Sequence, residues 1–195
     1  IRPLLWKNGW PVAGEVFKEG TYEIESERRG YALELAVDFV RMEYTRQRFW
    51  EKDDTPVVPL KSQTLEDVIE TWPQGKINVR IGDYMFRPHQ KWTITAVPDG
   101  GGYLGGPYYK IVIEGTNRAL AATADAEVVT VPEFTGAPEQ LWRIDQLTDG
   151  TYRIMPKEVP GTDKELVLVS VGDSTPSLGE FDMNSDNSKW NFRDH

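Results

Sequence analysis

Three pairs of one acidic and one aromatic residue occur along the chain, each shortly after a stretch in which apolar residues alternate along the sequence. An aromatic side chain matches the apolar face of a pyranose or furanose ring, so a ring with a polar group beside it is a candidate sugar contact. The pairs, with one asparagine that follows the last, are Asp83 with Tyr84, Glu133 with Phe134, and Phe181 with Asp182 and Asn184. The sequence therefore offers carbohydrate binding, rather than bond cleavage, as the chemistry to test.

A tryptophan follows each pair at a nearly constant interval. These residues are Trp92, Trp142 and Trp190, and each has an apolar residue two positions later. A period of roughly 50 residues indicates a repeat architecture. Upstream of each tryptophan, the pattern predicts a first strand with a tyrosine, a strand with leucine, and a strand of alternating apolar residues. The chain is therefore expected to contain three units of about four short strands.

Twelve separate strands of this kind cannot be independent hairpins, because an isolated hairpin is only marginally stable in water. A closed, pseudo-threefold assembly leaves no long unpaired strand edge and directs the three tryptophans to a shared interior. The sequence thus predicts an all-β fold with units at about 20–100, 101–149 and 150–195. A β-sandwich and an open barrel with a helical insert remain alternatives.

The first unit is longer than the others, which places an insertion at about 38–76. Thr64 with an acid three residues later predicts the start of a short helix, which Pro73 and Gly75 end. The insertion also holds Tyr44, Trp50 and Trp72, which are candidate sugar-stacking platforms, Trp50 and Trp72 above all. The alternative is that these aromatic residues anchor the inserted segment to the barrel or to a neighbouring domain.

The composition excludes several classes of function. A net charge of -9 disfavours binding to nucleic acids and to anionic membranes, which requires clustered Lys and Arg. The chain has no cysteine and only two histidines. The oxygen-rich run 182–187 lacks the glycine and the distal glutamate of an EF-hand calcium loop. We therefore expect no metal and no cofactor.

Catalysis by this chain is not expected either. With 31 acidic residues, carboxylate pairs are unavoidable, and most of them lie beside Lys or Arg as on a solvated surface. The glycine-rich stretch 99–106 lacks the lysine and the helix start of a phosphate-binding loop, so it is expected to be a flexible turn between the first two units. We predict a chain that is no enzyme by itself.

The order of a Tyr-x-Ile strand, a leucine strand and Gln-x-Trp resembles the ricin-B-type β-trefoil lectin repeat over about residues 20–195. The resemblance implies a β-trefoil of three pseudo-symmetric four-stranded units, with a loop and short helix inserted in the first. In this family each repeat can form a sugar pocket from an aspartate after the leucine strand, an aromatic platform and polar groups near Gln-x-Trp. Here the positions after the leucines are Glu34, Ala121 and Val167, and Ser188 replaces the third glutamine.

Residues 1–19 belong to none of the three units. Leu4 to Val12 resembles the WxxDGWPVV segment that closes the catalytic propeller of family 43 arabinanases, with Asn8 in place of the aspartate. This resemblance implies that the chain is a fragment, the C-terminal accessory domain of an arabinan- or xylan-degrading hydrolase. The alternative is an ordinary apolar strand whose two tryptophans pack beneath the barrel.

Two functions from different classes follow from these patterns. The first is a non-catalytic carbohydrate-binding module that targets a hydrolase to arabinan or xylan. Its partners would be a plant cell-wall polysaccharide and the catalytic domain of the same polypeptide, in an extracellular, cell-surface or periplasmic location. The second is a structural accessory domain that braces a family 43 propeller without binding sugar. A smaller possibility is a trefoil that binds proteins, as the soybean Kunitz-type inhibitors do.

Overall fold

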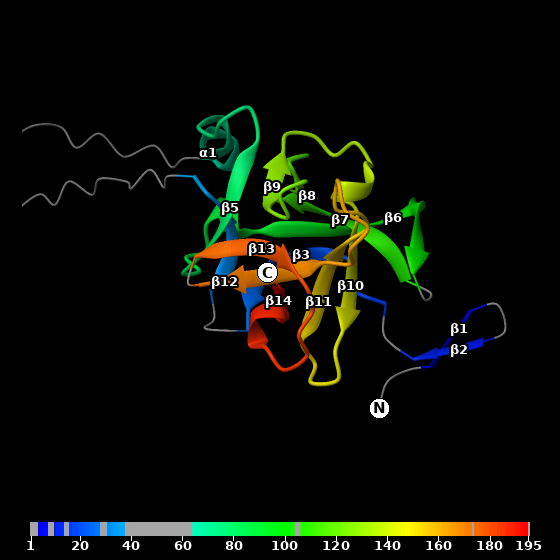
Figure 1. Ribbon diagram of the computed structural model, residues 1–195. Helices are drawn as coiled ribbons and strands as arrows, with labels where there is room; N and C mark the ends of the chain where they lie inside the picture. Colours follow the sequence, from blue (N-terminus) through cyan, green and yellow to red (C-terminus); the bar gives the residue numbers. More distant parts are fainter. Residues whose placement is uncertain are drawn as a thin grey trace, which may run out of the picture.

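The computed structural model describes residues 4–7, 10–13, 16–27, 31–37, 64–103, 106–172 and 174–194 (Figure 1). These residues form antiparallel strands, one short α-helix and three single-turn 3-10 helices at Pro88–Gln90, Pro138–Gln140 and Asp186–Ser188. No helix among these residues is long and apolar enough to span a membrane. The elements are β1 (Leu4–Lys7), β2 (Trp10–Ala13), β3 (Gly20–Ser26), β4 (Ala32–Leu35), α1 (Leu65–Glu70), β5 (Ile77–Gly82), β6 (Trp92–Tyr103), β7 (Gly106–Ile113), β8 (Ala119–Ala122), β9 (Val128–Val131), β10 (Trp142–Gln146), β11 (Tyr152–Pro156), β12 (Val167–Val171), β13 (Thr175–Gly179) and β14 (Trp190–Asp194).

Six strands close into a barrel. β3 pairs with β6, β6 with β7, β7 with β10, β10 with β11, β11 with β14, and β14 with β3, so the ring ends where it began. A closed ring has no edge strand, and each backbone ladder therefore finds a partner on both sides. The barrel is the frame from which all other elements extend.

Three hairpins accompany the barrel strands, namely β4 with β5, β8 with β9, and β12 with β13. They join one another as well as the barrel. β5 pairs with β9, the Leu178 N–H donates to the Ala126 carbonyl at 2.8 Å, and the Ile81 N–H donates to the Ser174 carbonyl at 2.9 Å. The three hairpins thus contact one another and form a second layer packed against the barrel.

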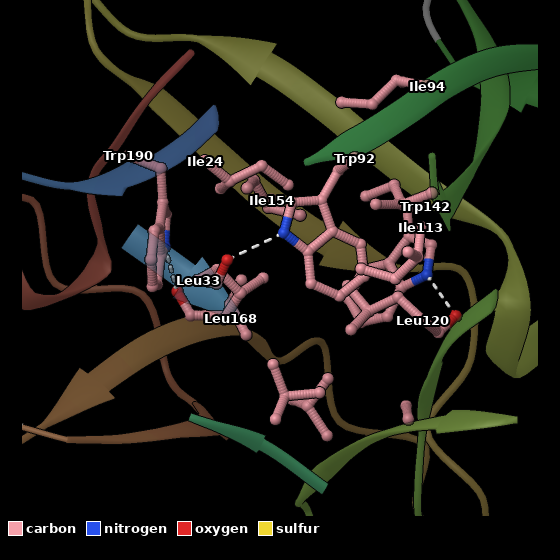
Figure 2. Packing of buried hydrophobic residues seen from close by; sticks show 14 of the residues in the cluster. Ile24, Leu33, Trp92, Ile94, Ile113, Leu120, Trp142, Ile154, Leu168 and Trp190 are labelled. Atoms are coloured by element: carbon pink, nitrogen blue, oxygen red, sulfur yellow. Dashed lines mark hydrogen bonds between the residues drawn. The ribbon is translucent and has the colours of Figure 1, made fainter. Parts of the chain in front are cut away.

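The three tryptophans lie at equivalent places in this arrangement. Each begins a barrel strand, is fully buried, and donates its indole N–H to the backbone carbonyl of a leucine in the hairpin of its own unit (Figure 2). The bonds are Trp92 to Leu33 at 2.8 Å, Trp142 to Leu120 at 2.9 Å and Trp190 to Leu168 at 2.9 Å. Opposite them across the ladder stand Tyr22, Tyr109 and Tyr152.

This rotational equivalence confirms the prediction of three repeats that meet at a common interior. The protein is a β-trefoil, and the β-sandwich and open-barrel alternatives are excluded. The fold also corrects the position of the third leucine. Leu168, not Leu166, is equivalent to Leu33, so the residue after the leucine is Val169 rather than Val167.

The glycine-rich stretch between the first two units differs from the expected flexible turn. β6 continues to Tyr103 and β7 begins at Gly106, so most of the stretch is extended hairpin. A register shift between Val97 and Gly102 accommodates the glycines. The pairing of β6 with β7 thus continues beyond this irregularity, because backbone bonds compensate for the absent side chains.

The predicted short helix is present as α1. Thr64 and Asp67 form a capping box, in which the Thr64 N–H donates to Asp67 Oδ2 at 2.8 Å and the Asp67 N–H donates to Thr64 Oγ1 at 3.2 Å. The extra chain of the first unit lies between β4 and β5, since 59 residues separate Trp92 from its leucine against 22 in each of the other units.

Trp72 follows α1 and is only 7% exposed, within the main hydrophobic cluster. Arg118 holds the backbone just beyond it, donating to the Pro73 and Gly75 carbonyls at 2.9 and 2.7 Å. An indole in this place cannot serve as a sugar platform. The burial instead supports the alternative interpretation, in which Trp72 anchors the inserted segment. Tyr44 and Trp50 lie outside the described residues.

The segment before the first unit also enters the core. β1 and β2 pair as a hairpin that forms its own two-stranded sheet. After it, the Phe17 ring packs against one tyrosine from each unit, with centroids 5.2 Å from Tyr22 and 5.7 Å from Tyr109 and Tyr152. Tyr109 donates its hydroxyl to the Phe17 carbonyl at 2.9 Å, and burial is the main cause that raises its pKa to about 12.

Replacement of a core tryptophan should therefore destabilise the fold, and more so when the whole ring is removed than when only its N–H donor is removed. We expect Trp142→Ala to lower the free energy of unfolding by about 3–5 kcal/mol through the cavity it leaves. Trp142→Phe should cost about 1–3 kcal/mol, because it leaves the buried Leu120 carbonyl without its hydrogen-bond donor. Urea denaturation measures both, with exposed Val171→Ala as a control expected within about 0.5 kcal/mol of the parent. Equal stability of Trp142→Phe and the control would contradict this account.

Candidate functional site

The position that holds the pocket aspartate in the ricin-type repeat is occupied in the first unit by Glu34, which the structure buries. Its carboxylate accepts from Arg80 Nε at 2.6 Å and from Gln90 Nε2 at 2.5 Å, and His89 Nε2 lies 3.4 Å away. Burial raises the pKa of Glu34, but the hydrogen bonds from His89, Arg80 and Gln90 together outweigh burial and lower it. The carboxylate is thus engaged by the protein itself. The equivalent residues Ala121 and Val169 have no polar side chain, so none of the three repeats has the family's pocket.

Gln90 connects this buried carboxylate to the loop that follows β5. Its Oε1 accepts the Met85 N–H at 2.8 Å, and its Nε2 also donates to the Asp83 carbonyl at 2.8 Å. Gln140 holds its own loop in the same way, accepting the Thr135 N–H at 2.7 Å. The two loops are therefore in one frame, with Met85 equivalent to Thr135 and the next residues, Phe86 and Gly136, also equivalent.

In the second and third units, the aromatic residue of each predicted pair is covered by a cation from a barrel strand. Lys110 Nζ lies 5.4 Å from the centre of the Phe134 ring, and the Arg153 guanidinium lies 5.0 Å from that of Phe181. Arg153 also donates to Asp145 Oδ2 at 2.8 Å. Each cation–π contact is satisfied within the protein, which leaves these aromatic faces engaged.

The first unit has the opposite charge at this place. The ladder pairs Thr95 with Lys110, Asp145 with Arg153 and, at the equivalent step, Arg193 with Glu23. Glu23 therefore stands where the other units place their cation. Arg193 turns to Glu25, with Nη2 2.8 Å from Oε2, rather than to Glu23.

Glu23 lines a hollow of about 480 Å³ that we call the unit-one hollow; its volume lies in the range of small-ligand sites. The other lining residues are Glu25, Asp83, Tyr84, Phe86, Arg193 and Asp194. Burial, followed by the neighbouring Glu25 charge, raises the pKa of Glu23, and Arg193 opposes the shift. Burial, then Glu23 and Glu114, raises the pKa of Tyr84. These shifts describe an acidic hollow with one cation in it.

Phe86 is the most unusual residue of the hollow. It is 74% exposed, its ring lies 4.8 Å from that of Tyr84, and its φ is 57°. The equivalent Gly136 has φ 81°. A bulky residue in the left-handed region is strained, and such strain concentrates at functional sites. An exposed aromatic ring thus occupies a left-handed position that holds glycine in the second unit.

The structure brings together only part of the predicted site. Asp83 and Tyr84 lie in the unit-one hollow, whereas Phe134 and Phe181 lie under the cations of their own units. Asp182 and Asn184 are exposed, and Asp182 Oδ1 accepts the Asn184 N–H at 2.9 Å. Sequence reasoning missed Glu23, Glu25, Phe86 and Arg193. An alignment of the first two units on their shared Gln-x-Trp motif, Gln90 and Gln140, would have aligned Phe86 with Gly136. No local sequence signal marks Glu23, Glu25 or Arg193.

A second hollow, of about 650 Å³, lies between the β6–β7 hairpin tip and residues 156–165. The Arg143 guanidinium lies 3.5 Å from the centre of the Tyr103 ring, and Lys157 Nζ lies 5.2 Å from that of Tyr108. Lys157 also donates to the Gly100 carbonyl at 2.8 Å. The cations of this hollow are thus engaged within the protein. Across the described ranges, no group of three or more His, Asp or Glu side chains could hold a metal ion.

Comparison with known proteins agrees with the geometry. The model of the family described as ricin-type beta-trefoil lectin domain-like matches residues 88–176. The match and the threefold architecture support a ricin-B-type β-trefoil lectin-like domain. No curated relative matches the sequence.

Solved structures with the same fold include three of different kinds. The designed threefold-symmetric protein ThreeFoil has a TM-score of 0.57 at 20% identity, over 90% of this chain and 99% of that one. A Polyporus squamosus lectin gives 0.59 at 16%, over 92% of this chain and 50% of the lectin. An exo-beta-1,3-galactanase from Clostridium thermocellum gives 0.55 at 15%, over 94% and 32%. At these identities the likeness shows the fold alone, and this chain spans half or less of the two natural proteins.

The buried carboxylate gives the lectin-like domain a defined pH dependence. Because the folded pKa of Glu34 lies below its ordinary value of 4.5, its ionised form stabilises the fold above that pH, and the contribution is lost as the pH falls through the folded pKa. We expect Glu34→Gln to cost about 1–3 kcal/mol at pH 7 and progressively less below about pH 4.5. Urea denaturation across this pH range measures the effect, with exposed Glu180→Gln as the control variant. Equal losses of stability in the two variants at every pH would contradict the account.

The left-handed conformation of Phe86 predicts a difference between two small replacements. Both Phe86→Ala and Phe86→Gly remove the ring, but only glycine relieves the strain at φ 57°. We expect the glycine variant to be about 1 kcal/mol more stable than the alanine variant in thermal or urea unfolding. An alanine variant as stable as the glycine variant would show that the position carries no strain.

Proposed function

We propose that this domain binds carbohydrate in the unit-one hollow and does not itself cleave it. The observation that carries the proposal is the exposed, strained Phe86 ring beside Tyr84, facing carboxylates in one hollow. A sugar ring has apolar C–H faces and hydroxyl groups at its rim. Aromatic rings cover the first, and carboxylates accept hydrogen bonds from the second.

The binding domain acts as a targeting module for a hydrolase of plant cell-wall polysaccharide, of the arabinan or xylan class. Two observations support this finer proposal. Residues 4–12 resemble the segment that closes a family 43 propeller, and a galactanase contains a domain of this fold as about a third of its chain. The partners are then the polysaccharide and a catalytic domain of the same polypeptide, in an extracellular, cell-surface or periplasmic location.

The second candidate function is a structural accessory domain that braces a catalytic domain without binding sugar. Phe17 favours it, because this residue fixes the segment after the β1–β2 hairpin into the centre of the barrel, where one tyrosine from each unit contacts it. A segment held in this way could fix the trefoil relative to a catalytic domain. The two functions differ in whether the isolated domain binds any glycan.

Affinity electrophoresis and calorimetry of the domain against arabinan, xylan and galactan test the proposal. We expect at least one of these glycans to bind the domain and retard it. Phe86→Ala should weaken this binding by about tenfold or more, which corresponds to a stacking contact of about 1.4 kcal/mol. Phe134→Ala is the matched control, because its ring lies in the second unit under Lys110 and should leave binding unchanged. Retention of no glycan by the parent domain would favour the structural function.

A further inference from the structure

We infer that the unit-one hollow takes neutral sugar residues and rejects acidic ones, with the Glu23 carboxylate accepting hydrogen bonds from two neighbouring hydroxyl groups. This inference rests on the proposed function and names the class of sugar. It starts from a reversal of charge among the three units: Glu23 in the first, Lys110 in the second and Arg153 in the third, at equivalent ladder positions.

Glu23 is buried yet lacks a direct partner. It is 3% exposed and lines the hollow, and in the described part of the chain no hydrogen bond or ion pair engages its carboxylate, because Arg193 binds Glu25 instead. A buried, unpartnered carboxylate is costly. An ionised carboxylate is an acceptor only, so the group that compensates it must donate. The Glu23 carboxylate is thus available to accept hydrogen bonds from a ligand that enters the hollow.

The other groups of the hollow decide which donors fit. Asp83 and Asp194 add acceptors, whereas Arg193 adds donors through a side chain that is 65% exposed. A hydroxyl group both donates and accepts, so a pair of hydroxyls on one sugar ring can serve Glu23 and Arg193 together. An ammonium group can donate to the carboxylates, which outnumber Arg193 in the lining, so the charge of the hollow does not exclude an amino sugar. A uronic acid would pair with Arg193 but be repelled by the surrounding carboxylates.

Phe86 and Tyr84 fix how such a ring enters. Their rings form one wall of the hollow, with centroids 4.8 Å apart and planes inclined by 50°. A sugar ring lying against this wall directs its equatorial hydroxyls away from the aromatic faces, toward the carboxylates. The second and third units present a lysine or an arginine at the Glu23 position, so they do not offer this combination of wall and acceptor.

Calorimetry with four defined hexamers tests the inference on the intact domain. The probes are xylohexaose and arabinohexaose, which are neutral, the galacturonic acid hexamer, which is acidic, and the glucosamine hexamer, which is cationic. We expect a neutral hexamer to bind at least about tenfold more tightly than the galacturonic acid hexamer, and the glucosamine hexamer to bind more tightly than the galacturonic acid hexamer, because the lining carries four carboxylates and one arginine. This comparison uses the parent domain only, so it does not depend on the folding of any variant.

Glu23→Gln then tests the residue itself. The amide replaces one acceptor oxygen by a donor, and we expect about tenfold weaker binding of the neutral hexamer, with a smaller penalty against the galacturonic acid hexamer. Lys110→Gln, at the equivalent position of the second unit, is the matched control and should bind like the parent. Unfolding in urea verifies that both variants are folded.

The results distinguish failure of the inference from failure of the proposed function. Binding that is lost in Phe86→Ala but unchanged in Glu23→Gln overturns the inference and leaves carbohydrate binding in place. Binding of the galacturonic acid hexamer as tightly as the neutral hexamers, or more tightly than the glucosamine hexamer, also overturns it. A parent domain that binds no hexamer and no polysaccharide overturns the proposed function, and the inference with it.

Discussion

The structure depends on one interaction made three times, the hydrogen bond from a buried indole N–H to the backbone carbonyl of a leucine. Each bond joins the start of a barrel strand to the hairpin of the same unit (Figure 2). Both groups are buried, so neither is open to bulk water, and an unmade bond would cost the full desolvation of both. The large indole also supplies apolar area at the common axis. The same side chain thus provides the burial and fixes the geometry of each unit.

Because that frame is fixed at the tryptophans and leucines, side chains elsewhere in the units are able to diverge. The ladder step that carries Lys110 in one unit and Arg153 in another carries Glu23 in the first. None of these changes alters the barrel, since the backbone pairing is the same at each step. A repeated fold therefore needs only one unit to bind, while the other two satisfy their aromatic residues internally and contribute stability.

The sequence predicts the repeat well because its signals are local. The spacing of the tryptophans gave the threefold architecture, and Thr64 with Asp67 gave the start of α1. The third leucine was misplaced by two residues because apolar residues in 166–169 alternate less clearly, and period-two alternation allows a slip of two. The expected flexible turn at 99–106 failed for another reason: backbone pairing compensated for glycines with no side chain to pack.

The site was harder to predict, since its residues come from three separate segments. Asp83 and Tyr84 lie in the loop after β5, but Glu23 lies on β3 and Arg193 on β14. Only closure of the barrel, which pairs β14 with β3, brings these together. Trp72 illustrates the opposite error. An aromatic residue in an insertion resembles a platform in the sequence, yet burial depends on contacts with distant residues such as Arg118, which holds the chain beside it.

Glu34 explains in physical terms why the first unit differs from the other two. At the position of the family's pocket aspartate, this side chain binds inward to Gln90, and Gln90 in turn holds Met85 and Asp83, the residues on either side of Tyr84. Phe86 follows directly, in a conformation that costs about 1–2 kcal/mol and that persists only if its neighbours are firmly held. The carboxylate that would have contacted a sugar in the family's pocket thus supports the loop of a different hollow. The buried network of Glu34 and Gln90 therefore stabilises the loop that holds the strained Phe86 ring.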